Sequence, residues 1–187
     1  MSRWKNLVGR WGSGAGETDD IRIDAATNTL QTIGYEHHEI HSGSHFYICG
    51  HQAMSNGEVV DFTVVTPNTT EWAHMTFSIE GTGAISLEIH EGATVDVAGT
   101  AVSVFNNNRN SANTTSLTVR EGDTFTGEGT LIYAQQVGAN KVAGSVQRDR
   151  EIVLDQNNTY IFRITNETAL ANELNYCAEW YEHTDKH

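Results

Sequence analysis

The sequence predicts an all-β protein: an antiparallel sandwich or jelly-roll-like single domain with an extended N-terminal arm. Three observations lead to this prediction. From about Asp20 onward, short runs of alternating apolar and polar residues are separated by turn residues about every 8 to 12 positions. The chain has 17 glycines and one proline, so it reverses direction mainly through Gly, Asn and Asp turns. Strongly helical periodicity is nearly absent.

A length of 187 residues is sufficient for one domain with a buried core and is short for several. We therefore expect an extended arm over residues 1–19 and a β domain over residues 20–187. The arm has no sustained hydrophobic period and ends in a Gly/Ser stretch. A disordered tail and a segment that folds onto a neighbouring subunit are both consistent with it.

The predicted strands are runs in which apolar side chains recur at every second position. In the clearest run Ile85, Leu87 and Ile89 share one face, as expected for a half-buried strand. In chain order, we expect strands over residues 29–33, 35–40, 45–49, 59–65, 74–80, 84–90, 94–97, 101–105, 116–120, 130–137, 151–154, 159–165 and 174–180. Ser42-Gly43-Ser44 is the best hairpin candidate, and residues 168–174 form either one or two helical turns or a loop.

The formal charge is -13 at pH 7, and it is unevenly distributed. Arg3, Lys5 and Arg10 are three of the 11 basic residues and precede the first acid, Glu17, which leaves eight basic and 24 acidic residues over 17–187, a net charge of -16. Unaided nucleic-acid binding requires clustered Lys and Arg, which the acidic body lacks. No run approaches the roughly 18 apolar residues of a membrane span. We therefore predict neither nucleic-acid nor membrane partners.

The two cysteines, Cys49 and Cys177, are too few and too far apart in sequence for a disulfide scaffold or a four-thiolate metal site. We expect both to be reduced core residues because free Cys is commonly buried, and whether they ever pair stays open. The first 16 residues lack the apolar run of about 7 to 15 residues that a secretory signal needs. We expect a protein that stays in a cytoplasm until it is assembled or released.

Histidines and carboxylates are densest over residues 35–45, YEHHEIHSGSH. On a strand His37 and His41 share one face, and after a hairpin His45 could return beside them, so that three imidazoles converge on a metal ion. However, an open hairpin face lacks the partly closed pocket of most metal sites. We therefore favour surface or subunit-interface positions for these residues and for His38, and we predict no metal site.

No catalytic motif is present. The sequence has no GxSxG elbow, and Asp19 and Asp20 are adjacent, so on a strand their carboxylates would point apart. The GTG and GEG triplets, residues 81–83 and 127–129, lack the third glycine and the helix of a dinucleotide-binding loop. We predict a non-enzymatic protein with no catalytic residue and no cofactor.

A polar run, FNNNRNS over residues 105–111, predicts a structured loop, because Asn adopts left-handed backbone conformations and bonds to its own backbone. Within it Arg109 could dock on an acidic or carbonyl-rich patch of a partner. Trp72 and Trp180 lie in or beside strand-like segments, and we expect both in the core.

Four blocks together resemble a family of small virion-associated proteins that are encoded beside capsid genes in many tailed bacteriophages. The blocks are IDAATNTLQTIGYEHHEIHSGSHF (residues 23–46), TPNTTEWAHMTFSIE (66–80), NNNRNS (106–111) and WYEHTDK (180–186). The resemblance implies a virion structural protein, namely a capsid decoration (cement) protein on the outside of the phage head. It would be synthesised in the host cytoplasm and would stabilise contacts between major capsid proteins.

By analogy, we expect copies to associate as trimers. The candidate contacts with the capsid or with other subunits are Arg3, Trp4, Lys5, Arg10, Trp11 and Arg109. The main alternative is a receptor- or carbohydrate-binding β-sandwich on a tail or fibre, and a cupin-type metal enzyme is a distant third.

Overall fold

The computed structural model describes residues 35–138 and 143–184. The predicted arm over residues 1–19 and the predicted strand over 29–33 lie outside the described residues. The strands belong to one compact unit, Glu39–His187. Among the described residues, no helix combines the length and apolarity needed to cross a bilayer.

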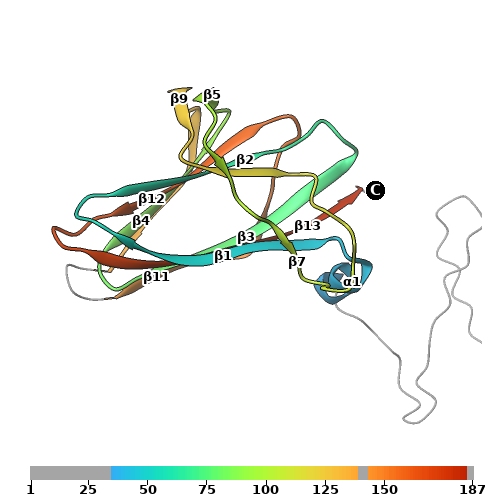
Figure 1. Cartoon of the computed structure of the whole chain (residues 1–187), viewed down its shortest axis with the longest axis horizontal. Coiled ribbons are helices and arrows are strands. Elements are labelled where there is room, and N and C mark those ends of the chain that lie inside the picture. The colour runs from blue at the N-terminus through green and yellow to red at the C-terminus, as the bar shows by residue number, and fades with distance from the viewer. Residues whose placement is uncertain (1–34, 139–142, 185–187) are drawn as a thin grey trace, which may run out of the picture. The chain divides into compact units, whose positions relative to one another are not determined.

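Two antiparallel sheets form a β-sandwich, which confirms the predicted fold class (Figure 1). The five-stranded sheet has the order β11 (Gly144–Val153), β3 (Glu71–Gly81), β13 (Asn172–Thr184), β1 (His45–Met54), β7 (Phe105–Asn106). The six-stranded sheet has the order β10 (Thr130–Val137), β4 (Ile85–Glu91), β12 (Thr159–Asn166), β2 (Val59–Val65), β8 (Thr118–Glu121), β6 (Thr100–Ala101). A separate ribbon pairs β5 (Thr94–Val97) with β9 (Thr124–Gly127).

The core lies between the two sheets, where alternate side chains of facing strands meet. The Phe77 ring of β3 packs edge-on against Phe162 of β12 at 5.7 Å between ring centroids, and Phe62 of β2 packs against Tyr176 of β13 at 4.6 Å. Trp180 is 1% exposed, which confirms its predicted core position. Period-2 alternation therefore turns one face of each sheet inward, as the sequence pattern predicts.

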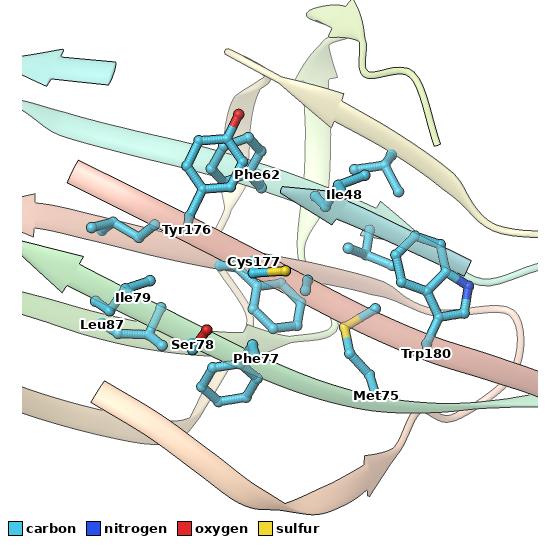
Figure 2. A pocket seen from close by; sticks show the side chains of 15 residues that line it. Ile48, Phe62, Met75, Phe77, Ser78, Ile79, Leu87, Tyr176, Cys177 and Trp180 are labelled. Carbon is cyan, nitrogen blue, oxygen red and sulfur yellow. The ribbon is translucent and has the colours of Figure 1, made fainter. Parts of the chain in front are cut away.

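A small apolar cavity of about 30 Å3 remains between the sheets, lined by side chains that include Phe62, Met75, Phe77 and Trp180 (Figure 2). A buried water requires two to four polar partners, and the apolar lining offers few. This space is therefore a packing gap of the core.

Most predicted strands match observed ones, and residues 59–65, 94–97 and 130–137 match to the residue. The predicted strand over 101–105 is wrong in its middle, since only its two ends pair, in β6 and β7. The structure adds β9 and the first half of β11, which were not predicted. Residues 168–171 form a loop rather than helical turns.

The predicted strand over residues 35–40 and the hairpin at Ser42-Gly43-Ser44 are both wrong, because this segment is a helix, α1 (Tyr35–Ser42). Gly43 has a φ of 79° and ends the helix in the left-handed conformation that suits glycine. The Gly43 amide donates to the Ile40 carbonyl at 3.1 Å, and the Ser44 amide donates to the Glu39 carbonyl at 3.0 Å. These two bonds form a Schellman motif, which satisfies the last carbonyls of the helix.

The expectation that the cysteines are reduced core residues is also wrong. Cys49 of β1 and Cys177 of β13 are directly opposed in the antiparallel register and form a disulfide. Cys49 is exposed and Cys177 is half-buried, because both side chains point to the outer face of the five-stranded sheet. The bond links two adjacent strands that are 128 residues apart in sequence.

Reduction of this disulfide is expected to lower the free energy of unfolding, because a crosslink across so long a loop restricts the unfolded chain. The loop-entropy relation gives an upper value of about 4 to 5 kcal/mol. Urea unfolding should therefore show a lower midpoint with reductant, equal to that of the Cys49→Ser/Cys177→Ser double variant. Two titratable thiols in the oxidised folded protein, or equal midpoints with and without reductant, would contradict the crosslink.

Candidate functional site: the outer face of the five-stranded sheet

The outer face of the five-stranded sheet carries a row of ring side chains from three neighbouring strands. His45 of β1 is opposite Tyr181 of β13, and Tyr181 is opposite His74 of β3. Tyr181 stacks on His74 at 4.7 Å between ring centroids and lies 6.5 Å from His45. Directly opposed positions in a sheet face the same side, so the register alone brings these three rings together.

Glu151 of β11 joins this row from the edge of the sheet. The pairing of β11 with β3 shifts register between Arg148 and Ile152, and such irregularities re-aim side chains. Glu151 Oε2 accepts hydrogen bonds from Tyr181 Oη at 2.6 Å and from His74 Nδ1 at 2.8 Å. Burial tends to raise the pKa of the Glu151 carboxyl, but the hydrogen bonds from Tyr181 and His74, together with electrostatic attraction from His74 and His183, hold the pKa below its ordinary value.

His183 of β13 completes the set, which we call the histidine-tyrosine cluster: His45, His74, Glu151, Tyr181 and His183. The Nε2 atoms of His74 and His183 lie 2.9 Å apart. The Nδ1 atom of His183 lies 2.9 Å from the backbone oxygen of Thr184. The two imidazoles thus meet through their Nε2 edges.

Trp72 lies beside this cluster on the same face and is directly opposite His183. Its side chain is 38% exposed, so the expected core position is wrong for this tryptophan. The reason is strand parity, since Ala73 and Met75 fill the core positions of β3 and leave Trp72 and His74 on the other face.

Residues 106–113, the asparagine loop, are held by side-chain amides, which confirms the prediction of a structured loop. The buried Asn106 amide group donates to the carbonyls of Gly43 at 2.8 Å and Asn113 at 3.2 Å, and its Oδ1 accepts from the Asn108 amide at 2.8 Å. Asn107 Nδ2 lies 2.6 Å from His45 Nδ1 and connects the loop to the histidine-tyrosine cluster. Side-chain hydrogen bonds therefore tie the loop to Gly43, to His45 and to itself.

A buried carboxylate holds the chain where it leaves this loop. Glu182 of β13 accepts hydrogen bonds from Ser116 N at 2.8 Å, from Trp180 Nε1 at 2.9 Å and from the hydroxyl of Thr115. A charged group at 6% exposure requires such donors to compensate for its lost hydration. The loop is thereby anchored to the central strand of the sheet.

The asparagine loop presents Arg109 to solvent. The Arg109 Cζ lies 5.4 Å from the centroid of the Phe105 ring, and Phe105 in turn packs against Tyr47 of β1 at 5.8 Å. Phe105 is 43% exposed. We call Tyr47, Phe105 and Arg109 the arginine-aromatic patch.

A polar cleft of about 500 Å3 lies at the same end of the sheet. Its lining includes Glu71, Asn113, Thr114 and Glu182. Its volume is within the range of small-molecule sites.

Of the predicted interface residues, Arg109 lies within the described part of the chain and is exposed. Arg3, Trp4, Lys5, Arg10 and Trp11 lie outside the described residues.

A convergence of His37, His41 and His45 would require the predicted strand and hairpin, and this segment forms the helix α1 instead. His37, His38 and His41 are exposed on α1, whereas His45 is buried at the start of β1. Within the part of the chain that the structure describes, no group of three or more His, Cys, Asp or Glu side chains is arranged to hold a metal ion.

Sequence reasoning missed His74, Glu151, Tyr181 and His183 as functional candidates. His74, Tyr181 and His183 could have been noticed, because apolar-polar alternation along their strands directs their side chains away from the core. Their convergence could not, because it depends on β3 and β13 being neighbours and on the irregular pairing of β11.

None of the protein-family models compared with the chain matches it, and no curated protein and no solved structure matches it either.

Replacing Asn106 with Ala is expected to lower the free energy of unfolding by about 1 to 3 kcal/mol, because it leaves buried backbone groups without partners. Amide hydrogen exchange over residues 107–113 should accelerate in this variant. Asn110→Ala, a change at an exposed position of the same loop, is the control and should leave stability within about 0.5 kcal/mol. Unchanged exchange in Asn106→Ala would show that the side-chain network does not hold the loop.

Proposed function

We propose that this chain is a non-enzymatic structural protein of a virus particle, a decoration protein that binds the outside of a tailed-bacteriophage head. In this role it stabilises contacts between major capsid proteins. The observation that carries the proposal is the arginine-aromatic patch, in which a hydrogen-bonded loop holds Arg109 over Phe105 on an exposed surface. The resemblance of four sequence blocks to virion-associated proteins supplies the class of particle.

A rigid Arg and aromatic pair is suited to binding a protein surface. Arg, Tyr and Trp are enriched at interface hot spots, and a loop that is ordered before binding loses little conformational entropy on association. Arg109 contributes a planar donor group that matches carboxylates or carbonyls of a partner. The hydrogen bonds of Asn106 and Asn108 supply the order.

The net charge and the sheet edges are consistent with a protein that must stay soluble until it binds a capsid. The net charge of -13 makes copies repel one another. At one edge each sheet ends in a strand of only two residues, β6 in one and β7 in the other. Short edge strands offer little template for pairing between copies.

We further propose that the arm, with Trp4 and Trp11, docks on the capsid and that copies associate as trimers on the virion surface. Native mass spectrometry of the purified protein tests the trimer. A monomer or a dimer at all concentrations, on and off the capsid, would refute that part of the proposal without affecting the capsid contact.

Arg109→Glu is expected to weaken binding to undecorated capsids by about thirtyfold or more, the loss typical of a hot-spot residue. Co-sedimentation with capsids over a range of protein concentrations measures the affinity. Arg150→Glu, an equal change of charge at an exposed position of β11, is the matched control and should bind as the wild type does. Equal binding by both variants would show that Arg109 does not contribute to the capsid interface.

Deleting residues 1–16 should abolish capsid binding while the circular dichroism spectrum of the β-sandwich is retained. An electron cryomicroscopy map of the virion locates the chain directly. Density between major capsid subunits supports the decoration role, and density on the tail or fibres alone would refute it.

A second candidate function is a receptor- or carbohydrate-binding module of a tail or fibre. It is favoured by the exposed ring of Trp72 and by the polar cleft near the asparagine loop. Sugars stack on exposed aromatic rings and bond to amide and carboxylate groups, and both occur here. Specific glycan binding that is lost in Trp72→Ala or Glu71→Gln would favour this function, and the absence of glycan binding would reject it.

A further inference from the structure

The His74 and His183 side chains have an arrangement that folding alone does not require. They come from neighbouring strands, β3 and β13, in which Trp72 is opposite His183 and His74 is opposite Tyr181. The two histidines are therefore diagonal neighbours on the outer face. Their Nε2 atoms approach to 2.9 Å while the ring centroids are 4.6 Å apart and the ring planes are tilted by 38°.

The hydrogen bonds of the other ring nitrogens fix the tautomers. His74 Nδ1 is 2.8 Å from the Glu151 carboxylate, and His183 Nδ1 is 2.9 Å from the Thr184 carbonyl. A carboxylate and a carbonyl can only accept hydrogen bonds, so both Nδ1 atoms carry the proton. In the neutral imidazoles, both Nε2 atoms then present lone pairs to each other. Two lone pairs at this distance require an electrophile between them, either a proton or a metal ion.

The distance suits a metal ion. With each nitrogen about 2.0 to 2.1 Å from the ion, a separation of 2.9 Å corresponds to an angle of about 90° at the metal. This angle occurs in octahedral and square-planar sites, whereas a tetrahedral ion would require the nitrogens to separate to about 3.3 Å.

The surroundings of His74 also match those of a metal ligand. Metal-bound histidines commonly donate their second ring N–H to a carboxylate, which fixes the ring and makes it a stronger ligand. Glu151 occupies this position, and the Tyr181 hydroxyl holds Glu151 at 2.6 Å. The His74 side chain is 18% exposed, which leaves solvent access to the pair.

We propose that His74 and His183 form a two-histidine binding site for a divalent first-row transition-metal ion. Water or a bound molecule supplies the remaining ligands, since the described residues hold no third protein ligand at this point. The proposal is independent of the decoration role, because it concerns the isolated chain and its metal affinity.

Isothermal titration with Ni2+ and Zn2+ tests the site in the full chain. Imidazoles elsewhere bind these ions too, so every measurement uses a background in which His37, His38, His41 and His187 are replaced by Gln. The background protein should bind one ion. His74→Gln and His183→Gln should each abolish this binding, and His51→Gln, a change at an exposed position of β1, should retain it.

Electron paramagnetic resonance of bound Cu2+ counts the nitrogen ligands. The background protein should show two imidazole nitrogens, and each single variant should show one or none. Glu151→Gln and Tyr181→Phe keep both imidazoles and should weaken binding by about 10-fold to 100-fold. These two variants keep the test decisive if a histidine variant does not fold.

Three outcomes would overturn the proposal. Equal binding in the background protein and in both His74→Gln and His183→Gln would place the ion elsewhere. A single nitrogen ligand in the background protein would exclude a two-histidine site. Absence of binding at millimolar metal would leave a shared proton as the electrophile between the imidazoles.

Discussion

The antiparallel register of β13 between β1 and β3 is the constraint on which the rest of the structure depends. Because side chains alternate along a strand, this register directs Leu174 and Trp180 into the core and Cys177, Tyr181 and His183 to the outer face. A slip by one residue would exchange the two faces, exposing the core and burying the imidazoles, so burial of the inner face fixes the position of every outer-face group. The disulfide between β1 and β13 reinforces the same pairing.

Local periodicity predicted the fold class and most strands, since alternation is a property of neighbouring residues in sequence. Local periodicity failed at residues whose structure does not follow from apolar-polar alternation. Residues 35–42 contain little apolar pattern, and the sequence signal for the helix is Gly43 at the position of a C-terminal cap, which local pattern does not distinguish from a turn between strands. Trp72 was assigned to the core by residue type, although its parity relative to Ala73 and Met75 places it outside. The candidate site cannot be predicted from local pattern for a different reason. His74, Glu151 and His183 meet only through the order of the strands and the irregular pairing of β11 with β3.

The asparagine loop is ordered by side-chain hydrogen bonds rather than by apolar packing. Loops usually carry function at the cost of mobility, but here buried amides and the Glu182 carboxylate replace apolar packing as the source of order. Hydrogen bonds are directional, so this kind of order specifies one loop conformation more narrowly than apolar contact would. Under the proposed role, the arginine-aromatic patch would lose little conformational entropy on binding.

The disulfide between β1 and β13 lies on the outer face of the five-stranded sheet, where the redox environment can act on it. Disulfides are rare in a reducing cytoplasm and persist in oxidising surroundings. A protein that is made in a host cell and then displayed on a released particle passes from the first environment to the second. Under the proposed location, the chain would fold and assemble with its register held by the core alone and would acquire the crosslink afterwards. The crosslink would then stabilise the chain only after the particle has left the cell.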